Sequence, residues 1–392
     1  MFGYGSLAVV LVLYLVELGL DALAVGAVLT LTLIGDTLIS LWLTTHADRL
    51  GRRRVLIVGS ALIAGAGVAF ALTDQLPLLI LAATIGVISP TGNEVGPFLA
   101  VEQAALTQVV PDRRRTATFA WYNLLGYVAT ATGALVAGLA SQILLDNGLA
   151  PVDADRAIVI GYSGIGLLMA LLATRIGPAV EAPAGVGRAT PDGVRRRLGL
   201  GRSRRTVLRL SALFSLDAFA GGFIPQSLLA YWFHLRFDVG PGTLGLIFFA
   251  ANLLAAVSSL SAAWIAARIG LVRTMVFTHL PSNVLLLLVP LMPTLPLAVG
   301  VLLLRSSLSQ MDVPTRQSYV MAVVDPDERS AAAGVTGVAR TVGAAVSPSL
   351  SSLLLANAAW LAAPFYLAGG LKIAYDLLLY RGFRSHRPPE ER

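Results

Sequence analysis

Hydrophobic residues occur along this chain in long runs separated by short charged turns. The runs 22–44 and 55–72 are each long enough to cross a bilayer, since a helix needs about 20 residues to span roughly 30 Å of hydrocarbon. Between them lies the charged turn Ala47–Arg54, and a weaker copy of it, Ala266–Arg273, separates two later runs. Runs of this kind follow one another from Met1 to Tyr380. They predict an all-α membrane protein with about twelve transmembrane helices.

The second half of the chain repeats the first in the same orientation. The loop Val109–Arg113 is echoed by Val323–Arg329, and a stretch rich in Pro, Gly and Arg lies between the halves. Two parallel repeats of six helices usually enclose a site near the middle of the membrane. The predicted division is an N-terminal bundle at 1–176, a cytoplasmic linker at 177–204, a C-terminal bundle at 205–380 and a cytoplasmic tail at 381–392.

Composition supports the membrane assignment and narrows the chemistry. Hydrophobic residues make up 56% of the chain and charged residues 13%, against about 25% charged in average soluble domains. Cysteine is absent, which excludes disulfides and thiolate metal sites. The four histidines are assigned to loops and helix ends without metal-ligand spacing, and there is no phosphate-binding loop. We therefore expect no enzyme, no metal and no cofactor. The histidines are His46, His234, His279 and His386.

Positive charge is concentrated in alternate loops. The net charge is +7, and Lys372 is the only lysine, so the excess of arginine indicates base composition of the genome rather than phosphate recognition. By the positive-inside rule, the central loop and the C-terminus are cytoplasmic. The expected location is the cell (inner) membrane. The expected partners are lipid, protons and a small molecule, with no nucleic acid, and the expected state is a monomer.

The first charged turn carries a family signature. Asp48, Arg49, Gly51, Arg52 and Arg53 match the pattern Gly-x-x-x-Asp-Arg-x-Gly-Arg-Arg/Lys, with Thr44 in place of the leading glycine. In this respect, and over nearly its whole length, the chain resembles the major facilitator superfamily of secondary transporters. The resemblance implies a twelve-helix fold, alternating access and a gating role for these five residues.

Two features depart from that resemblance. The Gly-Pro signature of drug antiporters is missing from the fifth span, where Gly126, Gly133 and Gly138 remain as expected close-packing positions. The first span, Met1–Val16, is short of about 20 residues, so we expect either a missing cytoplasmic first turn, which we favour, or a short first helix around which the bilayer thins.

Interrupted spans predict the substrate site. Ser89–Pro97 breaks the fourth span with two prolines and two glycines, and Arg305–Pro314 breaks the equivalent tenth span. The seventh span adds Asp217, Gly221, Gly222, Pro225 and Gln226. A charge in hydrocarbon costs roughly 2.5 kcal/mol or more, so charged residues there usually face a partner or a wet cavity. Alternatively, the prolines only shape the helix and Glu94 pairs permanently with Arg305. The candidates for substrate binding or coupling are Asn93, Glu94, Asp217, Gln226, Arg305, Gln310 and Asp312.

Three charge pairs are predicted. Aligning the repeats puts Glu102 opposite Arg316, where the two could close an inner gate. Asp36 and Arg340 lie at similar depth, roughly 18 Å from the cytoplasmic helix ends. In the family that the chain resembles, their helices meet across the two halves, which makes them a candidate interdomain ion pair. Lys372 and Asp376 stand four residues apart on the last helix and are expected to neutralise each other.

These patterns predict a secondary transporter that moves a small organic solute by alternating access, with proton-coupled efflux. Arg305 and Arg316 leave open the uptake or exchange of an organic anion. A membrane sensor or lipid-handling protein on the same fold also stays open, since fold does not fix function.

Overall fold

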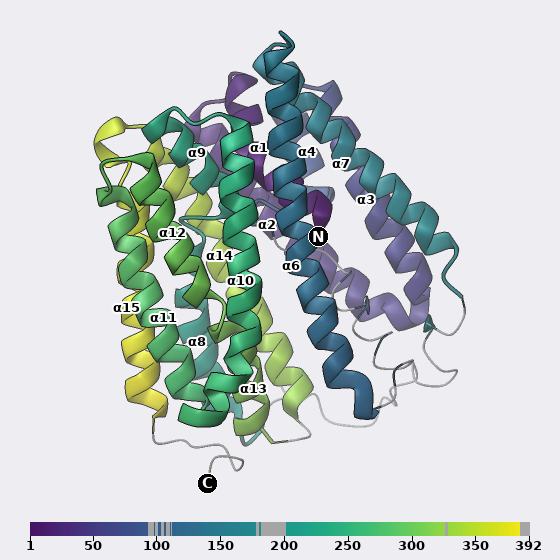
Figure 1. The fold of residues 1–392 in the computed structure, drawn as a ribbon. Helices are drawn as coiled ribbons and strands as arrows, with labels where there is room; N and C mark the ends of the chain where they lie inside the picture. Colours follow the sequence, from purple (N-terminus) through teal and green to yellow (C-terminus); the bar gives the residue numbers. More distant parts are fainter. Residues whose placement is uncertain are drawn as a thin grey trace. The chain divides into compact units, whose positions relative to one another are not determined.

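The computed structural model describes residues 1–92, 98, 101–102, 106, 110, 112–177, 180–181, 201–325 and 328–384. Within these ranges every regular element is a helix (Figure 1). Eight described helices or helix pairs are long and apolar enough to cross a membrane, and α1 and α4 are shorter apolar helices. The all-helical prediction is confirmed, and the arrangement is consistent with twelve spans.

The chain forms two compact units. The first comprises residues 1–191 and 225–249, and the second comprises 192–224 and 250–392. That residues 225–249 pack with the first unit was not predicted from the sequence. The first unit contains α1 (Phe2–Glu17), α2 (Ala22–Leu50), α3 (Arg52–Leu72), α4 (Leu76–Ile85), α6 (Asp112–Asp146), α7 (Pro151–Thr174), α9 (Gln226–Phe237) and the start of α10 (Pro241–Ile269). The second contains α8 (Arg204–Gly221), the rest of α10, α11 (Leu271–Leu288), η3 (Val289–Leu291), α12 (Leu295–Ser309), α13 (Asp312–Val323), α14 (Arg329–Leu355), η5 (Ala358–Trp360) and α15 (Ala363–Phe383).

The repeated charged turns have the same local geometry. Gly51 links α2 to α3 with φ 95°, and Gly270 links α10 to α11 with φ 86°. Glycine adopts this region without the steric cost that a Cβ brings. The glycine common to both copies is therefore explained by a turn that each repeat requires.

The two predicted interruptions, in the fourth and tenth spans, are present among the described residues, and the seventh span is interrupted as well. In the fourth span α4 ends at Ile85, and the segment that follows includes Gly92 with φ 74°. In the seventh span α8 ends at Gly221 and α9 begins at Gln226. In the tenth, α12 ends at Ser309 and α13 begins at Asp312.

Small residues let helices of the first unit approach closely. A Cβ on Gly133 would lie 2.1 Å from the Phe2 carbonyl oxygen, and one on Gly138 would lie 2.4 Å from that of Pro241. Gly126 is looser, since its nearest neighbour is the Met1 side chain at 3.3 Å. The predicted close packing is confirmed at Gly133 and Gly138, in keeping with helix association in lipid.

Large apolar side chains cover much of the helix surface. Leu72, Trp121 and Leu23 are 81%, 64% and 63% exposed. Such extensive exposure would be an aggregation liability in water but is expected of a surface that faces lipid. The interior of the second unit is built around Phe214, Tyr319 and Tyr375, all nearly fully buried. This core surrounds the polar groups described next.

Candidate functional site

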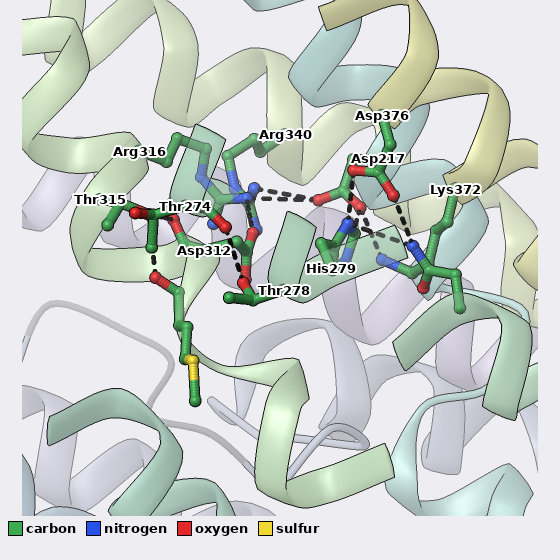
Figure 2. Close-up of polar contacts among 12 residues, drawn as sticks. Asp217, Thr274, Thr278, His279, Asp312, Thr315, Arg316, Arg340, Lys372 and Asp376 are labelled. Carbon is green, nitrogen blue, oxygen red and sulfur yellow. Dashed lines mark hydrogen bonds and ion pairs between the residues drawn. The ribbon is translucent and has the colours of Figure 1, made fainter. Parts of the chain in front are cut away.

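Asp217 lies at the centre of a buried polar cluster in the second unit (Figure 2). Its Oδ1 lies 2.6 Å from Lys372 Nζ and 3.9 Å from His279 Nε2. Its Oδ2 lies 3.3 Å from Arg316 Nη1 and 3.5 Å from Arg340 Nη1. One carboxylate on α8 thus faces cations from α13, α14 and α15 and an imidazole from α11.

Arg316 connects Asp217 to a second carboxylate. Its Nη1 lies 2.8 Å from Asp312 Oδ2, one helical turn away on α13. The guanidinium also lies over the Phe214 ring, 5.5 Å from its centroid. Arg316 and Asp312 are almost completely buried. Arg316 is therefore held by two carboxylates and one aromatic face, and of the three fixed cations it has the most partners.

His279 connects Asp217 to a third carboxylate. His279 Nδ1 lies 2.9 Å from Asp376 Oδ1, and Asn283 Nδ2 donates to Asp376 Oδ2 at 2.9 Å. Asp376 has no solvent exposure. We call the whole set the Asp217 cluster; it comprises Asp217, His279, Asn283, Asp312, Arg316, Arg340, Lys372 and Asp376.

Two sequence predictions are corrected by this geometry. Lys372 and Asp376 do not neutralise each other, because α8 offers Asp217 to the lysine and α11 offers His279 and Asn283 to the aspartate. His279 is not at a helix end, since it lies inside α11 and is 4% exposed. Its spacing of four residues from Asn283, within an apolar run, was the available signal of a polar face.

The formal charges of the cluster sum to zero. Among the described residues that form it, three carboxylates face three fixed cations, so the formal charge is zero while His279 is neutral. Buried ion pairs are tolerated in hydrocarbon only when paired and hydrogen-bonded. One added proton gives the cluster a net positive charge.

Arg305 and Gln310 lie on the interrupted tenth span but make none of the cluster's contacts given above. In the part of the chain that the structure describes, Arg305 Nε is buried without a hydrogen-bond partner. The Gln310 backbone N donates to Ser258 Oγ at 3.2 Å. Asn93 and Glu94 lie outside the described residues, so the alternative pairing of Glu94 with Arg305 stays a prediction.

The broken fourth and seventh spans meet inside the first unit. Ser227 N donates to the Pro90 carbonyl at 3.1 Å. The Gln226 side chain lies beside Gly92, where an added Cβ would be 3.2 Å from Gln226 Oε1. Gln226 is thus positioned by an interruption in each of two helices.

The signature turn is hydrogen-bonded to Thr174, at the end of α7, and to Glu181, which follows that helix. The backbone amides of Arg52 and Arg53 donate to the Glu181 carboxylate at 2.7 and 3.3 Å. Arg53 Nη2 also donates to the Thr174 carbonyl at 2.6 Å. The side chains of Asp48 and Arg49 lie outside the described part of the chain, so their gating role stays a prediction.

Glu102 and Asp36 each have a partner within the first unit. Tyr122 donates its hydroxyl to Glu102 beside a cavity of about 240 Å³ that Tyr4, Phe98 and Met169 also line. Ser40 Oγ donates to Asp36 Oδ1 at 3.2 Å. The proposed pairs of Glu102 with Arg316 and of Asp36 with Arg340 join residues of different units and stay predictions.

Comparison with known proteins agrees with the resemblance seen in the sequence. A model of the Major Facilitator Superfamily matches residues 1–306 and 210–392. An uncharacterized membrane protein of Saccharomyces cerevisiae is 29% identical over 405 residues, covering 97% of this chain and 90% of the relative.

Solved structures of transporters share the fold. A bacterial homolog to the human lysosomal transporter Spinster, in an inward-facing and occupied conformation, matches with a TM-score of 0.75 and 15% identity over 98% of this chain and 95% of that one. A D-xylose-proton symporter matches with a TM-score of 0.72 and 15% identity over 97% and 94%. Since the family model accounts for the chain from its first residue to its last, this multi-pass membrane protein belongs to the Major Facilitator Superfamily.

Proposed function

We propose that the protein is a secondary active transporter that moves a small organic solute by alternating access and couples this movement to protons. The observation that carries the proposal is the Asp217 cluster, in which carboxylates, fixed cations and an imidazole are buried among helices of a membrane protein. Ionisable groups at such places usually mark substrate paths or proton relays.

Charge balance supports proton coupling in particular. Because the cluster is neutral with His279 uncharged, one proton or one charged substrate group changes which ion pairs are favourable. A transporter needs such a change to link occupancy to conformation. The similar structure of a D-xylose-proton symporter is in keeping with this idea at the level of the fold. We propose export as the direction of transport.

Movement of an organic anion is the second candidate. Among the described residues Arg305 Nε has no hydrogen-bond partner, and the Arg340 side chain is 35% exposed with Asp217 at 3.5 Å. Guanidinium groups bind carboxylates and phosphates through paired donors. An anionic substrate would use these two arginines.

Reconstituted protein tests both candidates. Purified protein is first screened for thermal stabilisation by organic acids, amines, sugars and nucleosides, since a ligand of the folded state raises the unfolding midpoint. Compounds that stabilise it are then added to proteoliposomes with an internal pH dye. We expect proton flux that depends on the compound and falls at least about tenfold in Asp217→Asn, equivalent to roughly 1.4 kcal/mol.

Each alternative has its own outcome. Flux of a stabilising organic acid without proton movement would favour anion exchange. Binding without any flux would favour the sensor or lipid-handling alternative. The control is Gly164→Ala, at an exposed position of α7 where an added Cβ meets nothing within 4 Å, and its flux should match wild type.

A further inference from the structure

We propose that His279 is the residue that binds the coupled proton, and that its protonation releases Arg340 from Asp217. The inference rests on the proposed function, because it assigns residues to the coupling step of that transporter. The geometry of His279 between two carboxylates carries it.

His279 has more acceptors around it than a neutral ring can satisfy. Its Nδ1 lies 2.9 Å from Asp376 Oδ1, and its Nε2 faces Asp217 Oδ1 at 3.9 Å. A neutral imidazole carries a single N–H, so one nitrogen must direct its lone pair toward an acceptor. A second proton on the ring would give each carboxylate a donor. The pocket therefore has room for one proton more than the neutral ring holds.

We assign the present arrangement to the neutral ring with its N–H directed at Asp376, because a carboxylate accepts and does not donate. Asn283 Nδ2 also lies 3.2 Å from Nδ1. The distance of 2.9 Å is that of a hydrogen bond, whereas 3.9 Å is too long for one. Asn283 Nδ2 donates to the other oxygen of Asp376 at 2.9 Å and fixes that carboxylate. Protonation of Nε2 would create a donor that draws Asp217 toward the ring.

Arg340 is the partner that Asp217 would lose. Lys372 is held at 2.6 Å, and Arg316 keeps Asp312 at 2.8 Å whatever Asp217 does. Arg340 has the longest of the three distances from the fixed cations to Asp217, 3.5 Å, and its side chain is 35% exposed, against 7% for Arg316. A new charge on His279 would therefore displace Arg340 first, freeing a guanidinium for a substrate or for another carboxylate.

Charged and titratable groups surround His279 on several helices. Asp217 and Asp376 lie against the ring, and Asp217 also faces the three fixed cations. Tyr375 presents its ring edge-on at 6.0 Å. The titratable and charged groups that α8, α12, α13, α14 and α15 supply are Asp217, Arg305, Asp312, Arg316, Arg340, Lys372, Tyr375 and Asp376.

The first test observes the proton directly. Protein labelled with ¹⁵N in its imidazoles is studied by NMR between about pH 5 and pH 8, the range in which histidine changes charge. Comparison with His279→Gln assigns the resonance, and His234→Gln, which removes a ring bonded to the Val239 carbonyl, is the control. We expect a neutral ring protonated on Nδ1 at high pH and a doubly protonated ring at low pH. A ring that keeps one proton throughout would overturn the proposal.

The second test measures the release of Arg340. The lowering of the unfolding midpoint by Arg340→Gln is determined at about pH 8 and about pH 5.5, in wild type and in His279→Gln. We expect the loss to shrink by more than half at the lower pH in wild type, and to be the same at both values in His279→Gln. The exposed Arg209→Gln on α8 is the matched control. An equal loss at both values in wild type, or a difference that survives in His279→Gln, contradicts the proposal.

Neither test needs a transported substrate, so the inference and the proposed function can fail separately. Proton-coupled flux that persists in His279→Gln would retain the transporter and reject His279 as its proton site. A titrating His279 and a pH-dependent Arg340, in a protein without flux, would retain the switch and reject transport.

Discussion

Asp217 is the residue on which most ion pairs of the cluster depend. Its side chain is 6% exposed and faces Lys372, Arg316, Arg340 and His279. Removing one member of a buried ion pair leaves an uncompensated charge in low dielectric, which costs more than the intact pair contributes. Removing one charge of the cluster should therefore cost much stability, whereas removing a carboxylate together with a cation should cost less.

Neutralising Lys372 and Asp217 together should be milder than the sum of the two single changes. Lys372→Met and Asp217→Asn each leave a buried charge without its nearest partner, so we expect each to cost about 3–5 kcal/mol of stability. The double variant removes both charges at once. Unfolding midpoints of the four proteins measure the difference.

The control for this cycle is a pair nearer the surface. Arg156 and Asp153 lie 2.7 Å apart with side chains 35% and 51% exposed, and Asp153→Asn, at the more exposed member, should cost less than about 1 kcal/mol. Strictly additive costs of Lys372→Met and Asp217→Asn would show that the two charges do not depend on each other.

Glu328 gives the protein a pH dependence outside the membrane. Its carboxylate accepts from the backbone amides of Gly201, Arg202 and Ser203 at 2.6, 3.1 and 3.0 Å, just before α8. Burial favours the neutral acid, but these amide donors outweigh it and lower the pKa of Glu328 below its usual value of 4.5. The stabilisation is therefore present above pH 4.5 and is lost as the pH falls through the lower value in the folded protein.

We expect Glu328→Gln to lower the unfolding midpoint at neutral pH, and the gap to wild type to close as the pH falls below 4.5. Thermal unfolding over a pH series measures this gap. Asp146→Asn, at an exposed carboxylate that accepts from Gln142 Nε2, is the control and should differ little from wild type at any pH. A gap that widens in acid would contradict the assignment.

At the scale of elements, two features have different effects. Close approach holds helices together, whereas an interruption frees backbone groups of a helix for other partners. α1 and α6 approach so closely that Gly5 meets Thr130 and Gly133 meets Phe2, and in lipid such contact replaces the hydrophobic effect as the source of association. The breaks in the fourth, seventh and tenth spans instead free backbone groups for other partners, as the bond from Ser227 N to the Pro90 carbonyl illustrates.

Gly133→Ala should separate α1 from α6. The added methyl would lie 2.1 Å from the Phe2 carbonyl oxygen, which is backbone and cannot rotate away, so we expect a loss of about 1–3 kcal/mol. Gly164→Ala on α7 meets nothing within 4 Å and should be neutral or stabilising by up to about 1 kcal/mol. Thermal unfolding compares the two. Equal midpoints would contradict the close packing of α1 on α6.

At the scale of the whole molecule, each of the two units holds its own polar system. The second contains the Asp217 cluster, and the first contains Glu102 with Tyr122 and the turn fastened by Glu181. In transporters built from two repeats, transport requires the repeats to move against each other around a site. A charge network confined to one unit would couple a proton to that movement only if the two conformations bind the proton with different affinity.

The sequence predicted the features that depend on local pattern alone. Apolar runs of membrane length determine helices, glycine at positions 51 and 270 determines turns, and prolines and glycines predict the interruptions of the fourth and tenth spans. The superfamily could likewise be recognised from the turn at 47–54, and the family model confirms it. Each of these signals lies within one helix or one loop, so no knowledge of neighbouring helices was needed.

Only the tertiary structure decided which charges meet. From the sequence, Lys372 and Asp376 form a pair and His279 is incidental, because spacing along one helix is all that a sequence displays. In the folded unit α8 and α11 supply Asp217, His279 and Asn283, so the lysine and the aspartate take different partners across helix boundaries. Ionisable side chains in hydrocarbon must find a partner somewhere, and packing alone determines where. The sequence by itself thus placed Asp217, Arg316, Arg340 and Lys372 within apolar spans, and the packing of those spans determined the network that they form.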